Sequence, residues 1–116
     1  MNVRKFFRSF RYAMEGLFTA LHEQNFRFHI ASAIIVIMAG LLTGLSIVEW
    51  CIIIFVIAFV IGAELINTAI ERVVDLASPE IHPLAKQAKD VAAGAVLVFA
   101  LASVIIGLLI FLPKWF

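Results

Sequence analysis

The chain has 116 residues, of which 64% are hydrophobic and 15% are charged. A soluble fold of this size cannot bury so much apolar surface, so we expect most of the chain to face lipid. The net charge of +1 does not indicate a nucleic-acid partner, and a single cysteine excludes an intrachain disulfide. The basic start lacks the short apolar core and cleavage site of a signal peptide, so we expect the whole sequence to be mature protein.

The N-terminal segment, residues 1–27, has an amphipathic helical pattern. Phe6, Phe10, Ala13 and Leu17 recur at helical spacing, and the charged residues recur on the other side. This pattern predicts a helix that lies on the cytoplasmic surface of the membrane. A helix that packs on a partner protein is the alternative.

Three long apolar stretches follow, and they predict three membrane-spanning helices. Residues 30–48 and 91–112 carry no charge, so each can supply the ~20 apolar residues of a span. The middle stretch is long enough only if Glu64 lies in the membrane or close to its surface. The prolines of the connection after Ser78 interrupt helix, which ends the second span there. The predicted spans are residues 29–48, 50–77 and 86–112 of a single membrane domain.

The basic residues predict the orientation of these spans. Eight of the nine Lys and Arg residues fall in the N-terminal segment or near the connection between spans two and three, and only Lys114 falls on the other side. The positive-inside rule therefore places the N-terminus in the cytoplasm and the C-terminus outside. Trp50 and Trp115 then lie at the outer boundary, where indole rings prefer to lie.

The second span carries a row of polar side chains. On a helix of 3.6 residues per turn, Glu64, Glu71 and Asp75 lie within ~40° of one another, and Asn67 lies ~60° to one side. A carboxylate near hydrocarbon costs ~2.5–3.5 kcal/mol, which is rarely tolerated without a function. Hydrogen bonding between helices is the structural alternative for Glu64 and Asn67.

Other polar residues gather at the same membrane level. Carboxylates bind Mg²⁺ together with its phosphates, and lysine neutralises phosphate charge. No Gly-rich nucleotide motif, zinc spacing or Ser-His-Asp arrangement is present. The pattern alone therefore predicts a site at the cytoplasmic face that binds a cation and can accept phosphate. The gathered residues are Glu23, Asn25, Arg27, His29, Glu80, His82, Lys86, Lys89 and Asp90.

Two segments, ELINTAIERVVD (64–75) and EIHPLAKQAKDVAAGAV (80–96), resemble the small prokaryotic diacylglycerol kinase family. EQNFRFH (23–29) and the basic amphipathic start match as well, so the resemblance covers nearly the whole chain. HPLAK and the short chain look most like the Gram-positive branch, whose members phosphorylate undecaprenol rather than mainly diacylglycerol.

The resemblance implies an all-α integral membrane protein: a homotrimer of three-span chains, each with a surface helix. Active sites would be shared between neighbouring chains at the membrane–cytoplasm boundary of the bacterial cell membrane. ATP and a lipid alcohol would be substrates, and Mg²⁺ the cofactor. By motif position, Glu64 would be the general base, and Glu23 and Glu71 would hold the metal. Tyr12, Glu23, Glu71, Glu80, His82, Lys89 and Asp90 would bind ATP, and Glu64, Asn67, Asn25, Arg27 and Ala93 would lie near the lipid.

Three readings of the function remain open at this stage. The expected activity is ATP-dependent phosphorylation of undecaprenol, with diacylglycerol kinase as the alternative within the class. A small ion or proton transporter would explain an intramembrane Glu64, but it would not explain the other polar residues on the same side. A membrane scaffold would use the polar row only to pack helices.

Overall fold

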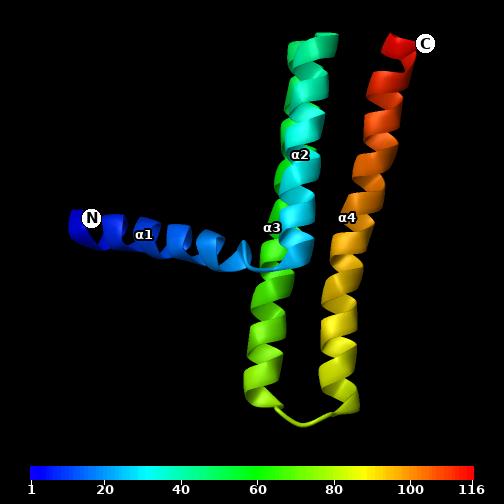
Figure 1. Cartoon of the computed structure of the whole chain (residues 1–116). Helices are drawn as coiled ribbons and strands as arrows, with labels where there is room; N and C mark the ends of the chain where they lie inside the picture. Colours follow the sequence, from blue (N-terminus) through cyan, green and yellow to red (C-terminus); the bar gives the residue numbers. More distant parts are fainter.

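The computed structural model describes all of residues 1–116, as four helices without strands. The three helices after the first are each long and apolar enough to cross a membrane. This confirms the predicted all-helical class with three candidate spans. In chain order the helices are α1 (Val3–Ala20), α2 (Gln24–Thr43), α3 (Ile47–Ala77) and α4 (Pro83–Trp115) (Figure 1).

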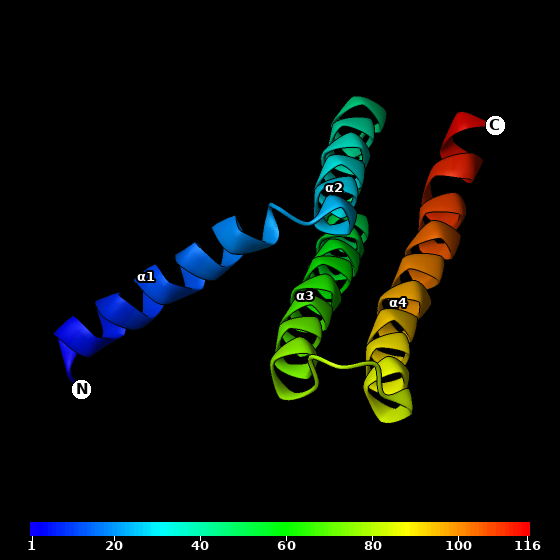
Figure 2. The same ribbon diagram turned by 60° about the horizontal axis from the view of Figure 1, so that its bottom comes forward.

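Helix α1 projects away from the other three helices in both ribbon views (Figures 1 and 2). The side chain of Asn2 caps it by accepting a hydrogen bond from the Lys5 N–H. At its other end the chain bends over residues 21–23, and the Arg27 guanidinium donates to the Leu21 carbonyl at 2.8 Å. The predicted segment 1–27 therefore contains α1, the bend and the first turn of α2.

A tight turn joins α2 to α3. Gly44 has a φ of +81°, which favours glycine because L side chains rarely adopt it. Ser46 and Glu49 form a capping box, in which each side chain accepts from the other residue's backbone N–H. The absence of a side chain at Gly40 lets the Trp50 ring lie against α2, since a Cβ there would come within 2.7 Å of the ring.

Helices α3 and α4 form a long hairpin, closed by residues 78–82. Ser78 caps the end of α3, as the prolines of the connection predict. His82 starts α4 by accepting the Leu84 N–H on its imidazole, and Pro83 occupies the first turn, where it needs no N–H partner. With 31 and 33 residues, the two helices are about 46 and 50 Å long, well beyond the ~30 Å of hydrocarbon in a bilayer.

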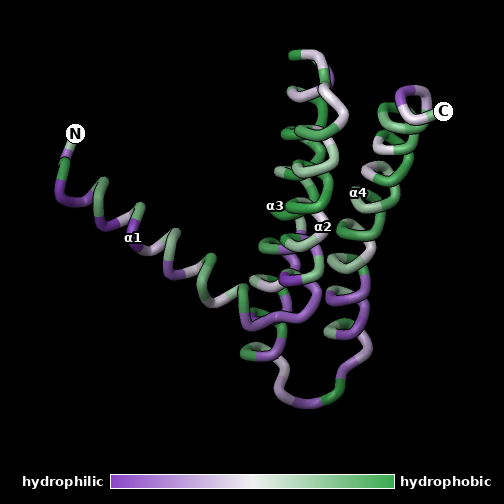
Figure 3. The backbone as a smooth tube through the Cα atoms, turned by 45° about the horizontal axis from the view of Figure 1, so that its top comes forward, coloured by the Kyte–Doolittle hydropathy of each residue, from purple (hydrophilic) through white to green (hydrophobic).

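Polar residues concentrate at the hairpin end and around the bend, while the other end of the bundle is mainly apolar (Figure 3). Two contacts tie the helices together at that apolar end. Lys114 pairs with Glu49 at 3.1 Å, and the Trp115 indole donates to Thr43 at 2.9 Å. Only 11 of the 116 residues are buried, so most apolar side chains face outward, as expected of a surface covered by lipid or by other subunits.

Candidate active site

The polar row of α3 runs from the interior of the chain to its surface. Glu64 is 3% exposed and Asn67 is 5% exposed, whereas Glu71 is half-buried and Asp75 is exposed. The four side chains share one face because their spacing follows the helical period. The deep end of the row therefore suits an apolar substrate, and the outer end suits a water-soluble one.

Glu64 faces helix α2. Its Oε2 lies 3.7 Å from Nε2 of His29, and both side chains are largely buried. A buried carboxylate is costly unless a donor or a charge compensates it, and His29 lies in position to do so. The structure thus joins the deep end of the row to the second helix.

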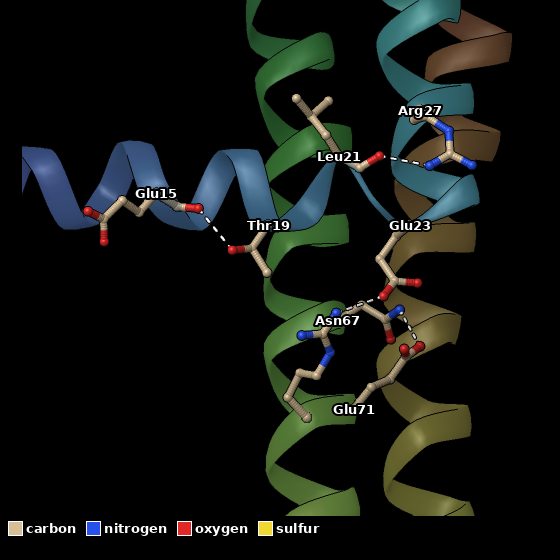
Figure 4. Close-up of polar contacts among 8 residues, drawn as sticks. Glu15, Thr19, Leu21, Glu23, Arg27, Asn67 and Glu71 are labelled. Carbon is tan, nitrogen blue, oxygen red and sulfur yellow. Dashed lines mark hydrogen bonds and ion pairs between the residues drawn. The ribbon is translucent and has the colours of Figure 1, made fainter.

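One turn further along, Asn67 and Glu71 contact each other on α3. The Asn67 side-chain N–H donates to Oε1 of Glu71 at 3.0 Å (Figure 4). Oδ1 of Asn67 is buried and accepts no hydrogen bond within the chain. Such a group costs about 1–3 kcal/mol, so it is a candidate contact for a substrate hydroxyl.

Arg72 connects this part of α3 to the bend before α2. Its guanidinium donates to Oε1 of Glu23 at 2.9 Å. Because Arg72 follows Glu71 directly, Glu23 lies beside the same stretch of α3, and Figure 4 shows both carboxylates in this region. The two acids predicted to hold a metal thus come from the bend before α2 and from α3, and they meet at one level of the bundle.

The outer end of the row reaches α4. Asp75 forms an ion pair with Lys89, and Lys86 pairs with Asp90 at 2.6 Å on the exposed side. An open cavity of about 290 Å³ lies inside the hairpin. Its polar lining comes from Asp75, Ser78, Glu80, His82, Lys86 and Lys89. The structure therefore brings Glu80, His82 and Lys89, three of the predicted nucleotide-binding residues, to one cavity.

Other predicted residues stand apart from these contacts. Tyr12 is exposed on α1, and Ala93 is exposed on α4. Asn25 is exposed in the first turn of α2, and the Arg27 side chain is held by the Leu21 carbonyl. Within a single chain, these residues do not join the row on α3.

The structure also adds residues that the sequence did not assign to the site. Arg72, which pairs with Glu23, is one of the eight basic residues that indicate the cytoplasmic side. Thr68, next to Asn67, is 8% exposed, and it lines a cavity of about 370 Å³ between α1 and α3. Thr68 gave no signal, since a lone threonine on an apolar helix is common. Arg72 gave none either, because it points about 100° away from Glu71 around the helix.

The carboxylates fit a hard divalent cation. Mg²⁺ is usually held by one or two carboxylates, with substrate phosphates and water completing its octahedron. Glu23 and Glu71 each use one oxygen in the contacts described, which leaves the other for a cation. No group of three or more His, Cys, Asp or Glu side chains that could hold a metal ion occurs within the chain.

Comparison with known proteins gives consistent matches. The model of the prokaryotic diacylglycerol kinase family matches residues 11–111. An undecaprenol kinase of Bacillus subtilis (strain 168) is 56% identical over 113 residues, which are 97% of this chain and 92% of the relative. A diacylglycerol kinase of Synechocystis is 45% identical over 90% of this chain and 61% of its own length. A diacylglycerol kinase of Helicobacter pylori is 34% identical over 82% of this chain and 75% of its own length. These matches confirm the resemblance drawn from the motifs.

Proposed function

Since the chain belongs to the prokaryotic diacylglycerol kinase family and is a multi-pass membrane lipid kinase, we propose that it transfers the γ-phosphate of ATP to undecaprenol at the cytoplasmic membrane interface. The observation that carries this proposal is the graded polar row of α3, which is buried at Glu64 and exposed at Asp75. A lipid alcohol and a nucleotide must meet at a boundary, because neither enters the other's solvent.

The length of α3 supports this placement. Counted from Ile47, about 20 residues cross the hydrocarbon, which brings the helix to the inner boundary near Ile66. Glu64 and Asn67 would then lie at the boundary, and Glu71 and Asp75 would lie in the aqueous layer. On α4, about 20 residues counted from Leu112 towards the N-terminus cross the hydrocarbon, and Lys89 lies beyond them, in the aqueous layer.

In the proposed reaction Glu64 is the general base. Its carboxylate accepts the proton of the lipid hydroxyl as the hydroxyl oxygen attacks the γ-phosphorus and ADP leaves. The free Oδ1 of Asn67, one turn along the same face, supports a role in holding that hydroxyl group. Asn25, Arg27 and Ala93 would contact the lipid around it.

Glu23 and Glu71 would hold Mg²⁺, which would supply positive charge to neutralise the phosphates of the nucleotide. Lys89 would contact phosphate, and its pairing with Asp75 would hold it ready at the rim of the hairpin cavity. Tyr12, Glu80, His82 and Asp90 would complete the nucleotide site. Positioning and charge neutralisation are most of what phosphoryl transfer requires, so a chain without a Gly-rich loop can supply them.

The proposal includes a homotrimer with shared sites. Tyr12 and Ala93 are exposed in one chain, and contributions from a neighbouring chain would bring such residues to the reactants. The proposed orientation has α1 on the cytoplasmic surface, the N-terminus inside and the C-terminus outside, which agrees with the distribution of basic residues.

Transfer of labelled γ-phosphate from ATP by the purified protein tests the proposal. Reactions with undecaprenol, with diacylglycerol and without lipid are compared in the same micelles. We expect lipid-dependent transfer, with undecaprenol giving the higher kcat/KM. Preference for diacylglycerol by a large factor in kcat/KM would make the chain a diacylglycerol kinase instead. The absence of transfer to either lipid would refute the proposed reaction.

A further inference from the structure

The proposed general base has a polar neighbour, His29, to which neither the motifs nor the proposed mechanism assigns a role. Nε2 of His29 on α2 lies 3.7 Å from Oε2 of Glu64 on α3, and the side chains are 14% and 4% exposed. No other ion pair or side-chain hydrogen bond of Glu64 occurs within the chain. His29 is thus the one side chain that pairs with this carboxylate within the chain.

The location of His29 argues against an incidental contact. It lies in the second turn of α2, where the helix enters the membrane, and a polar side chain there is costly unless it is partnered. The Phe28 ring packs edge-on against the imidazole, with the ring centroids 5.6 Å apart. His29 also lines a narrow, mainly apolar cavity of about 90 Å³ between the helices. The ring is therefore held among apolar groups with its Nε2 towards Glu64.

The separation of 3.7 Å is longer than a hydrogen bond, which ends near 3.2 Å for nitrogen and oxygen. Contacts of catalytic groups are often long before substrate binds and shorten in the reacting complex. A small rotation of either side chain would close this gap. The pair is therefore arranged for a hydrogen bond that forms when the site is loaded.

We propose that His29 is a positioning residue of the kinase: its Nε2–H donates to Oε2 of Glu64 and thereby leaves Oε1 to accept the proton of the lipid hydroxyl. This rests on the proposed function, because it assigns Glu64 the role of base. The lipid O–H bond breaks, its proton goes to Oε1, the oxygen–phosphorus bond forms and ADP leaves with the electron pair of the broken bond. The proton then passes from Glu64 to water, and His29 ends the cycle unchanged.

The same contact could instead serve only to hold α2 against α3. The two roles make different demands on the side chain. Helix packing needs volume, which phenylalanine would supply, whereas positioning needs an N–H at the place of Nε2. Glutamine can supply that N–H, since its side-chain amide reaches about as far from the backbone as Nε2 of histidine.

The test compares His29→Phe and His29→Gln in purified protein, with His22→Gln as the matched control. His22 is exposed after the end of α1 and has no assigned role. We expect His29→Phe to lower kcat for the lipid by about 10²-fold, the usual cost of a misplaced catalytic group, with an unchanged KM for ATP. The kcat of His29→Gln should be at least about tenfold higher than that of His29→Phe, and the kcat of His22→Gln should match that of the native protein. The three variants should have the same oligomeric size and thermal stability in detergent.

A second measurement reads the contact without catalysis. The chain has three histidines, so the ¹⁵N imidazole signals can be assigned by single substitution. We expect Glu64→Gln to shift the His29 signals and to leave those of His22 and His82 in place. Unchanged His29 signals would overturn the proposal.

The kinetic measurements also test the positioning role of His29. Full activity of His29→Phe would overturn the positioning role, and so would equal loss in the folded Phe and Gln variants. These results differ from a failure of the proposed function, in which the native protein itself shows no lipid-dependent transfer. If native transfer occurs but Glu64→Gln retains it, Glu64 is not the base, and a normal rate for His29→Phe would follow.

Discussion

Replacement of Glu64 by glutamine tests the proposed chemistry at its deepest point. The two side chains have the same shape, and the site is 3% exposed, so Glu64→Gln changes neither the volume nor the helix contacts. The amide can still contact His29, but it cannot accept a proton from a hydroxyl group. The substitution therefore removes base catalysis while it preserves the surrounding packing.

The expected magnitude follows from that single loss. General base catalysis contributes about 10²–10⁴-fold to a rate, which corresponds to about 3–5 kcal/mol of barrier at 1.36 kcal/mol for each factor of ten. We expect Glu64→Gln to lower kcat by a factor within this range. Binding of Mg·ATP should stay close to native, because Glu64 lies about 10 Å along α3 from Glu71.

The assay measures transfer of labelled phosphate at saturating ATP and lipid, together with ATP binding in the absence of lipid. Glu49→Gln is the matched control, since Glu49 lies on the same helix at the opposite end and pairs with Lys114. It should keep the native rate and lose at most a little stability. Glu64→Gln activity above about a tenth of native would contradict the base assignment, because that is less than the smallest expected effect.

Three further substitutions test other parts of the structure. Glu71→Ala should raise KM for Mg·ATP by about 10–100-fold, the value of one charged contact, and a kcat loss with unchanged KM would contradict its ligand role. Arg72→Gln breaks a solvent-exposed ion pair, so unfolding experiments in detergent should show a change within about 1 kcal/mol, and a larger loss would mean that the pair holds the bend. Gly40→Ala places a Cβ within 2.7 Å of the Trp50 ring and should lower stability by about 1–3 kcal/mol, whereas Gly107→Ala, which meets nothing within 4 Å, should not.

Much of the fold follows from patterns that act locally. Uncharged stretches of sufficient length require helices in lipid, because every backbone polar group must find a partner within its own segment. The prolines after Ser78 and the glycine at position 44 mark where the chain turns. The helix starts were less predictable: α4 begins at Pro83, three residues before the expected start of the third span, because proline and the His82 cap favour helix there.

The polar row of the site was also visible in the sequence, whereas its partners were not. Periodicity places Glu64, Asn67 and Glu71 on one face whatever the neighbouring helices do. Which residues they meet depends on the rotation of α2 about its axis and on the bend at residues 21–23, and no local pattern encodes either. The contacts of His29 with Glu64 and of Arg72 with Glu23 join residues far apart in sequence, so they required the structure.

In the proposed reaction, the length of the α3–α4 hairpin explains how so small a chain would present a site for two very different substrates. A helix that ended at the bilayer surface would leave its last carboxylate at the boundary and would offer nothing to a nucleotide. Helix α3 instead continues for about 11 residues beyond the ~20 that cross hydrocarbon, and α4 extends beside it by a similar length. The continuous helix fixes the spacing from Glu64 to Asp75 at about 16 Å, so the proposed base and the charged groups proposed to lie in water share one rigid support. Phosphoryl transfer depends mainly on such fixed positioning, so in the proposed mechanism the helix overhang, rather than a loop, is the feature that this chain contributes to catalysis.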